Sequence, residues 1–157
     1  MLRTQFAPFA AFFVLGNAVT VCYAESELVR ACEFTVKSRC ASGEARATFS
    51  GDELTKLAIN VYWCGLPGKL GYSCVVEYAR NDDISSWAES GGVVTIENRS
   101  PSNSSLPDRI KVTAKRHISI DLEEAQSSGT CGAGAELPRA IVIPERKDTC
   151  RVWLAAL

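Results

Sequence analysis

Seven cysteines are the residues whose type and spacing could do chemistry here, as metal ligands, a redox pair or disulfide cross-links. Zinc sites and redox pairs use two cysteines separated by two residues, and zinc also needs further cysteine or histidine ligands. The sequence has no C-x-x-C spacing, and its one histidine is His117. The cysteines therefore predict disulfides, with no metal site and no cofactor.

The first 24 residues, "MLRTQFAPFAAFFVLGNAVTVCYA", predict a signal peptide. They contain one cation, Arg3, followed by an uncharged and largely apolar stretch that ends in the small residue Ala24. This order of features is typical of a secretory signal. Cleavage after Ala24 removes Cys22 and leaves residues 25–157, which we expect to form a single domain.

Two alternatives exist for this segment. A membrane anchor needs about 20 apolar residues, and Pro8 and several polar residues interrupt this stretch. A lipoprotein would be modified at Cys22, but the branched Val21 stands where a small residue is expected. We therefore expect no membrane span after cleavage.

An even number of cysteines in an exported chain predicts a disulfide framework formed in an oxidising compartment, either periplasmic or extracellular. Cys64 and Cys74 flank a loop rich in glycine and proline, "GLPGKLGYS", that lets the chain reverse, so these two are expected to pair. The cysteines left after cleavage are Cys32, Cys40, Cys64, Cys74, Cys131 and Cys150.

The other pairings follow from distance. A strand between Cys32 and Cys40 would hold these two residues about 25 Å apart. A disulfide needs Cα atoms within about 7 Å, so they are not expected to pair with each other. Each should instead pair with Cys131 or Cys150, in either order.

His117 is the natural candidate for acid–base catalysis. Ser119 and Asp121 follow it at intervals of two along an expected strand, so the three side chains point the same way without converging. The carboxylates match no glycosidase or calcium-loop signature, and the glycines match no phosphate loop. We therefore expect no catalytic residues and no enzyme activity; a hydrolase with an unrecognised site is the alternative.

The net charge argues against one class of partner. Arg3 is the only charged residue among the first 24, so the remaining chain has 16 basic and 18 acidic residues. Nucleic-acid binding normally requires a basic excess on one face. We expect no nucleic-acid partner.

The clearest element is "RIKVTAKRHISIDL", residues 109–122, where apolar side chains alternate with polar ones. Period two predicts a half-buried antiparallel strand, or two strands meeting at a bend, and Arg116 interrupts the apolar face. Together with the shorter candidates, this predicts a mainly β fold, a β-sandwich or barrel-like antiparallel sheet stabilised by disulfides. The shorter candidates lie at 33–38, 44–50, 73–80, 93–98, 139–144 and 150–154.

One helix is expected near residues 51–64. Ser50 followed by Glu53 is a capping-box signature, and Gly65 can end the helix. The β-branched and aromatic residues of this segment would also suit a strand. Helical spacing is shown by Leu54, Leu57, Ala58 and Val61.

The stretch "FTVKSRCASGEARATFS" places an aromatic residue and a cysteine before a glycine and an expected strand. From Phe34 to Phe49 it resembles the opening of bacterial periplasmic C-type lysozyme inhibitors, which are small disulfide-linked β-barrels. That family carries a serine-glycine-x-x-tyrosine inhibitory loop, whereas the "SGGVV" that begins at Ser90 lacks the tyrosine. The expected helix and the additional cysteines also depart from the pattern, and we assign no family.

These features predict an exported, non-enzymatic binding protein whose partner is a protein or a cell-envelope component. The alternative is a periplasmic inhibitor or immunity protein acting on a secreted hydrolase such as a lysozyme. Contacts are expected from two long loops, 98–108 and 123–136, and from a polar strand face. The candidate contact residues are Trp87, Lys111, Lys115, Arg116 and His117.

Overall fold

The computed structural model of the chain describes residues 27–64, 71–99, 109–124, 131 and 137–154. A four-stranded antiparallel sheet has the order β1 (Glu27–Val36), β2 (Ala41–Ser50), β3 (Glu53–Trp63) and β4 (Tyr72–Ala79). A six-stranded antiparallel sheet has the order β10 (Arg151–Trp153), β9 (Ala140–Ile143), β8 (Ile118–Asp121), β7 (Arg109–Ala114), β6 (Val93–Asn98) and β5 (Ser85–Ser90). The prediction of a mainly β, disulfide-linked fold is confirmed.

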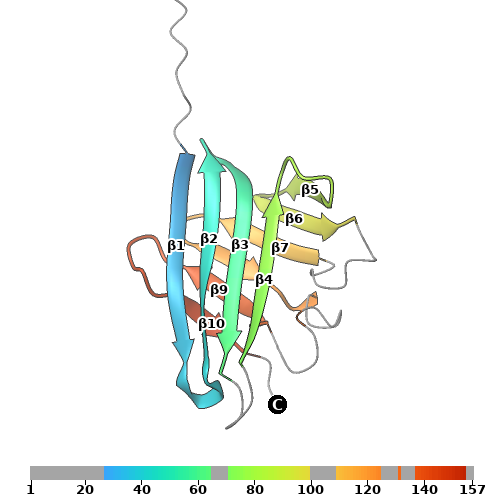
Figure 1. Cartoon of the computed structure of the whole chain (residues 1–157). Coiled ribbons are helices and arrows are strands. Elements are labelled where there is room, and N and C mark those ends of the chain that lie inside the picture. The colour runs from blue at the N-terminus through green and yellow to red at the C-terminus, as the bar shows by residue number, and fades with distance from the viewer. Residues whose placement is uncertain (1–26, 65–70, 100–108, 125–130, 132–136, 155–157) are drawn as a thin grey trace, which may run out of the picture.

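The two sheets pack face to face. The strands of the six-stranded sheet run across behind those of the four-stranded sheet (Figure 1), an arrangement in which each sheet buries one face against the other. Alternation along the strands supplies the apolar side chains of the core, as in β4, where Cys74, Val76 and Tyr78 are buried at every second position. The largest fully buried side chains include Tyr78, Leu54, Leu57, Ile59, Ile96, Ile110, Ile118, Ile120 and Ile141.

The alternating segment 109–122 forms two strands that meet at a bend, which confirms the second of the two alternatives predicted for it. β7 pairs with β8 in the register Val112↔Ile120, and residues 115–117 form the turn between them. Arg116 breaks the apolar pattern because it lies in this turn and not in a strand.

The predicted helix near 51–64 is wrong, since this segment is strand β3. Leu57 and Ile59 are buried on the inner face at strand spacing, but Leu54 lies three positions before Leu57. A β-bulge explains the irregular step, because Thr48 pairs with Lys56 and Phe49 pairs with Leu54, which leaves one extra residue in β3. That extra residue turned a period-two pattern into an apparent helical one.

Within the described residues, the helical segment is the three-residue turn η1 (Lys37–Arg39). None of the described helical structure has the length and apolar character that crossing a membrane requires. The predicted signal peptide, residues 1–24 with Cys22, lies outside the described residues.

The predicted Cys64–Cys74 disulfide is wrong. Cys74 pairs with Val61 across β3 and β4 and points into the core, whereas Cys64 lies three residues past that pair. The amide of Cys64 instead donates to the carbonyl of Cys40 at 3.0 Å, which sets these two cysteines side by side where β2 begins and β3 ends.

The disulfides are Cys32–Cys150, Cys40–Cys64 and Cys74–Cys131. The expectation that Cys32 and Cys40 do not bond to each other is confirmed, and Cys32–Cys150 is one of the two pairings left open for Cys32. The expectation that Cys40 joins Cys131 or Cys150 is wrong, because the hairpin register already places Cys40 beside Cys64.

The first strand is tied to the six-stranded sheet just before β10. The Glu33 amide donates to the Asp148 carbonyl at 2.7 Å, and the Cys150 amide donates to the Glu33 carbonyl at 2.8 Å. Glu33 and Thr149 form an isolated parallel bridge, and the Cys32–Cys150 disulfide lies beside it. Residues 148–150 are thus fixed to β1 by backbone hydrogen bonds and by one covalent bond.

Candidate functional site

An open groove of about 390 Å³ lies over the outer face of β9 and β10, and we call it the basic groove. The β7–β8 turn forms one side and the β9–β10 connection forms the other. Its lining residues are Arg116, His117, Val142, Pro144, Glu145, Arg146, Lys147, Thr149, Arg151 and Trp153.

Strand register places the floor of the basic groove. Arg151 of β10 lies opposite Val142 of β9, and Trp153 lies opposite Ala140. Arg151 and Trp153 are two residues apart on one strand, so both side chains point outward while Val152 between them packs against the core. Trp153 is 51% exposed, an unusual position for so large an apolar side chain.

The rim of the basic groove is held on both sides. Pro144 follows the end of β9, and residues 148–150 are hydrogen-bonded to Glu33 of β1. The connection that carries Arg146 and Lys147 therefore runs between two fixed points only a few residues apart. Such a short, anchored loop presents its charges with little conformational freedom to lose on binding.

Cations outnumber carboxylates in the basic groove. Four of its lining residues are Lys or Arg and one is an acid, Glu145, which gives a formal charge of +3 with His117 neutral. Arg116 forms one ion pair with Glu145 at 3.5 Å, but the Arg116 side chain is 90% exposed, so solvent screens this pair. In a chain whose total formal charge is −1, this is a local concentration of positive charge.

His117 and Arg116 are the two predicted contact residues that the basic groove brings together. Both belong to the β7–β8 turn, in which the Lys115 amide donates to the His117 carbonyl at 3.1 Å. Ser119 and Asp121 follow on β8, and the Asp121 carboxylate accepts the Glu123 amide at 3.0 Å. His117 therefore shares the groove with four cations and one acid, while Ser119 and Asp121 lie on β8 and are not among the groove residues.

Trp87 lies elsewhere, at the β4–β5 edge of the molecule. Its indole N–H donates to the Ser85 hydroxyl at 2.8 Å, and the Arg80 guanidinium lies 5.4 Å from its ring centroid. Arg80 is itself held by an ion pair with Glu53 at 2.9 Å and by donating to the Leu54 carbonyl at 3.1 Å. Trp87 is partly buried and packs against the core.

Lys111 also lies apart from the groove, in an ion-pair network across β6, β7 and the segment after β8. Its ammonium contacts Glu124 at 2.7 Å, and Arg109 contacts both Glu97 and Glu124. The hydrogen bond from Lys111 lowers the pKa of Glu124, and the hydrogen bond to Glu97 raises the pKa of Arg109. The fifth predicted residue, Lys115, faces a different cavity, and the contact role of all five stays a prediction.

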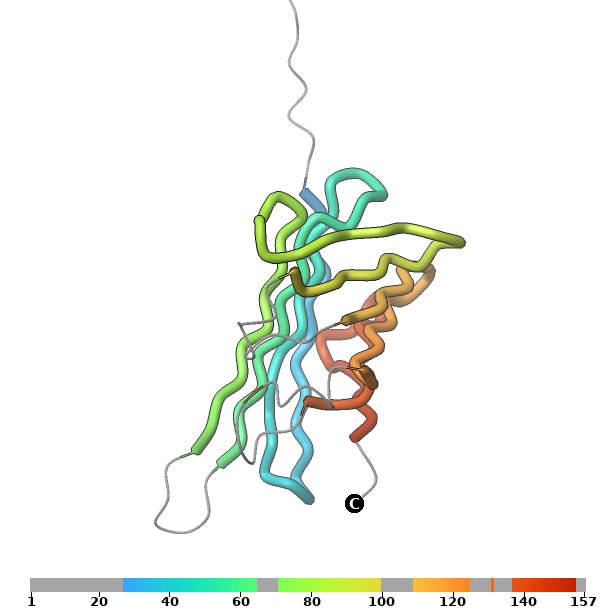
Figure 2. The backbone as a smooth tube through the Cα atoms, turned by 90° about the vertical axis from the view of Figure 1, so that its right-hand side faces the viewer, coloured from blue at the N-terminus to red at the C-terminus, as the bar shows by residue number. Residues whose placement is uncertain are grey.

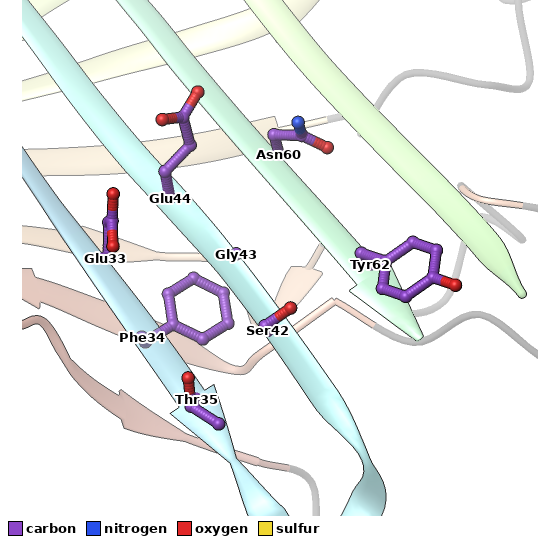
Figure 3. A pocket seen from close by; sticks show the side chains of 8 residues that line it. All are labelled: Glu33, Phe34, Thr35, Ser42, Gly43, Glu44, Asn60 and Tyr62. Atoms are coloured by element: carbon purple, nitrogen blue, oxygen red, sulfur yellow. The ribbon is translucent and has the colours of Figure 1, made fainter. Parts of the chain in front are cut away.

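A second hollow, of about 280 Å³, lies on the outer face of the four-stranded sheet (Figure 3). Glu33 and Glu44 stand directly opposite each other on β1 and β2, and Tyr62 on β3 is 50% exposed. The Phe34 ring lies beside Gly43, where a Cβ atom would come within 2.6 Å of it and within 2.2 Å of the Asn60 carbonyl oxygen. Gly43 is thus required by packing.

The sequence reasoning missed most of the basic groove. Arg146, Lys147 and Arg151 fall in "PERKDTCRVW", which places three cations within six residues of one another, immediately before Trp153. This local excess of charge beside a tryptophan was a usable signal. The alternating segment 109–122 gives a stronger pattern, and the predicted contact face was placed there. The predicted contact loops, 98–108 and 123–136, lie almost wholly outside the described residues.

In the described part of the chain, no group of three or more histidine, cysteine, aspartate or glutamate residues is placed to hold a metal ion. Comparison with protein-family models, with curated proteins and with solved structures found no match to this chain.

Proposed function

We propose that this chain is an exported, non-enzymatic binding protein whose basic groove binds an acidic surface of a protein partner. Export is supported by the three disulfides, since such cross-links form and persist in oxidising compartments, either periplasmic or extracellular. The observation that carries the binding proposal is the groove itself, which combines a formal charge of +3 with a half-exposed tryptophan.

The choice of a protein partner rests on the kinds of side chain present. Tryptophan and arginine are the residues most often found at the energetic centres of protein interfaces. Trp153 offers a large rigid contact surface, and Arg151 beside it can donate two parallel hydrogen bonds to one carboxylate. An acidic segment with an apolar neighbour would satisfy both.

The lining residues also favour binding over catalysis. A nucleophile or a general base needs a partner in hydrogen-bonding distance that activates it. His117 is flanked by Arg116 and shares the groove with Arg146 and Lys147, and none of these three cations can serve as the carboxylate that activates a catalytic histidine. Such a surface is suited to attracting negative charge.

The test measures binding of a fluorescein-labelled, glutamate-rich peptide that contains one aromatic residue, using the oxidised protein at low and moderate salt. We expect binding that weakens as salt rises, and Lys147→Glu should weaken it by about three- to tenfold. The matched control is Lys37→Glu, the same charge change at an exposed lysine outside the groove, which should have less than a twofold effect.

A second pair of variants isolates the aromatic contribution. Trp153→Ala should weaken peptide binding more than Tyr62→Ala, because both side chains are half exposed but only Trp153 lines the groove. Equal effects within either pair of variants would contradict the proposal. Dextran sulfate serves as a polysaccharide probe, and tighter binding of dextran sulfate than of the peptide would favour an anionic polymer of the cell envelope over a protein.

A further inference from the structure

Arg30 is a charged residue on the inner face of a core strand. It lies on β1 two positions before Cys32, whose side chain is buried in the core, and its own side chain is partly buried. The Nη1 atom of Arg30 is fully shielded from solvent and has no hydrogen-bond partner. Within the described residues, Arg30 also forms no ion pair. Buried polar groups in folded proteins are nearly always satisfied, so an unsatisfied guanidinium nitrogen requires an explanation.

Arg30 lines a cavity of about 320 Å³ between the two sheets, and we call it the Arg30 cleft. The cleft lies at the end of the sandwich where the β2–β3 turn faces the β5–β6 hairpin and the β7–β8 turn. Figure 2 shows β5 running across this end of the sandwich, above the remaining strands of its sheet. The lining residues are Leu28, Arg30, Phe49, Gly51, Asp52, Glu89, Ala114, Lys115 and Ile118.

The walls of the Arg30 cleft divide into two chemistries. Phe49 and Ile118 are buried core residues, and Leu28 is half exposed, so the inner walls are apolar. Asp52 and Glu89 are exposed residues of a turn and of a strand end, and Lys115 is an exposed residue of the β7–β8 turn. Neither carboxylate is ion-paired with Arg30 in the described chain, although both line the same cleft.

We propose that the Arg30 cleft binds a small amphipathic anion, with a single carboxylate on the Arg30 guanidinium and a short apolar chain against Leu28, Phe49 and Ile118. Rotation of the Arg30 side chain toward the cleft would bring Nη1 to the carboxylate and give it the acceptor that it lacks, and a charge-assisted hydrogen bond to arginine is among the stronger polar interactions in proteins. The volume is near the lower end of the range for ligand pockets, about 300–1,000 Å³, which suits a short chain.

The exposed acids set the selectivity of the cleft. Asp52 and Glu89 oppose the entry of a second negative charge, so a monoanion is favoured over a dianion. A neutral amphiphile of the same length would fill the apolar walls but leave the Arg30 nitrogen unsatisfied. A cationic amphiphile would be repelled by the partly buried Arg30, and its attraction to Asp52 and Glu89 is screened because both acids are exposed to solvent.

The first test compares three ligands of equal chain length by isothermal titration calorimetry with the full oxidised protein. Octanoate should bind, and octanol and octylamine should bind at least about tenfold more weakly. Absence of octanoate binding, or binding of octanol as tight as that of octanoate, would overturn the proposal. Tighter binding of octylamine would overturn it as well.

The second test uses a matched pair of variants. Arg30→Met should weaken octanoate binding by about tenfold or more. Arg46→Met should leave it unchanged, since Arg46 lies on the outer face of the neighbouring strand β2. Octanoate should also raise the midpoint of thermal unfolding of the wild type and of Arg46→Met, but not that of Arg30→Met. An equal thermal shift in all three proteins would overturn the assignment of Arg30.

A fold defect in Arg30→Met is separable from a binding defect, because the unfolding curve without ligand reports it directly. Arg30→Lys provides a second variant that keeps the charge but loses the two-pronged donor, and it should bind octanoate with intermediate affinity. The Lys147→Glu variant of the basic groove should bind octanoate as the wild type does, so failure at one site is distinguishable from failure at the other.

Discussion

Strand β1 meets the six-stranded sheet in two different ways along its length. Near Cys32 and Glu33, it is joined by a disulfide to Cys150 and by two backbone hydrogen bonds to residues 148–150. Near Leu28 and Arg30, the sheets leave the Arg30 cleft between them. The first region is closed by covalent and backbone bonds, and the second is left open around a charge.

The two regions of β1 differ in what they can do. The closed region has no open cleft, and its bonds to residues 148–150 hold the rim of the basic groove in place. The open region keeps a shielded guanidinium nitrogen without a partner, which lowers stability unless something binds there. The cross-linked contact and the proposed binding cleft therefore lie at opposite ends of β1.

The largest expected effect comes from removing the cross-link of the closed region. The Cys32→Ala/Cys150→Ala variant should lose about 5 kcal/mol of unfolding free energy, since this disulfide closes the longest loop, with a sequence separation of 118. Cys40→Ala/Cys64→Ala, with a separation of 24, should lose about 3.5 kcal/mol. Urea unfolding of the oxidised proteins measures both, and a reversed order would contradict the comparison.

The same double variant should also weaken binding of the glutamate-rich peptide, because the connection carrying Arg146 and Lys147 loses its covalent anchor. It should affect octanoate binding less. Peptide binding equal to that of the wild type would show that the backbone hydrogen bonds of Glu33 hold the rim without the disulfide.

The next effect is expected in the core of the closed region. Phe34→Ala should lose about 3–4 kcal/mol of unfolding free energy, because the ring is buried and packs beside Gly43. Val29→Ala, on the half-exposed outer face of the same strand, should lose about 0.5 kcal/mol. Similar losses for the two variants would mean that β1 is not packed as described.

Much of the closed region could be predicted from the sequence, because alternation reports which face of a strand is buried. The segments 33–38, 44–50 and 150–154 were all recognised as strands in this way. The strand 53–63 was not, since the bulge at Thr48 and Phe49 disrupts its period. A bulge depends on the partner strand, and no single segment carries that information.

The open region and the disulfide pairing were beyond sequence reasoning for a related reason. Cys64 and Cys74 are close in the sequence on either side of a glycine-rich segment, but Cys74 points into the core and is bonded to Cys131. Arg30 precedes the predicted strand at 33–38, so its position on the inner face was not evident. Both facts depend on register between strands, which becomes defined only when the sheets are assembled.

A smaller effect compares Arg30 with Arg80, which also has one shielded nitrogen without a hydrogen-bond partner but whose guanidinium is ion-paired. Arg30→Met should not lower the unfolding free energy, since it replaces an unpaired buried nitrogen by an apolar group. Arg80→Met should lower it by about 2 kcal/mol, because Arg80 bonds Glu53, Leu54 and the Trp87 ring. A larger loss for Arg30→Met than for Arg80→Met would show that Arg30 supports the fold.

The smallest expected effect lies on the exposed face of the six-stranded sheet and serves as a baseline for both regions. The hydrogen bond from Lys111 lowers the pKa of Glu124 below its ordinary value of 4.5. The ionised Glu124 therefore stabilises the folded protein fully above pH 4.5, and this stabilisation is lost as the pH falls through the lowered pKa. In Glu124→Gln, the free energy of unfolding should therefore fall slightly less than in the wild type as the pH is lowered. Urea unfolding between pH 3 and pH 6 measures this, and identical acid limbs would contradict it.

The Cys32–Cys150 bond has a further consequence for biogenesis. Nine of the ten described strands contain Cys32 or lie between Cys32 and Cys150, so the chain cannot form this bond until nearly every described strand has been synthesised. Until then, β1 is paired only with β2, and the end of the sandwich that holds the Arg30 cleft can form before the opposite end is cross-linked. We therefore expect Cys32–Cys150, which lies beside the basic groove, to be the last disulfide to form. Its formation should be slow because the two thiols are far apart along the chain.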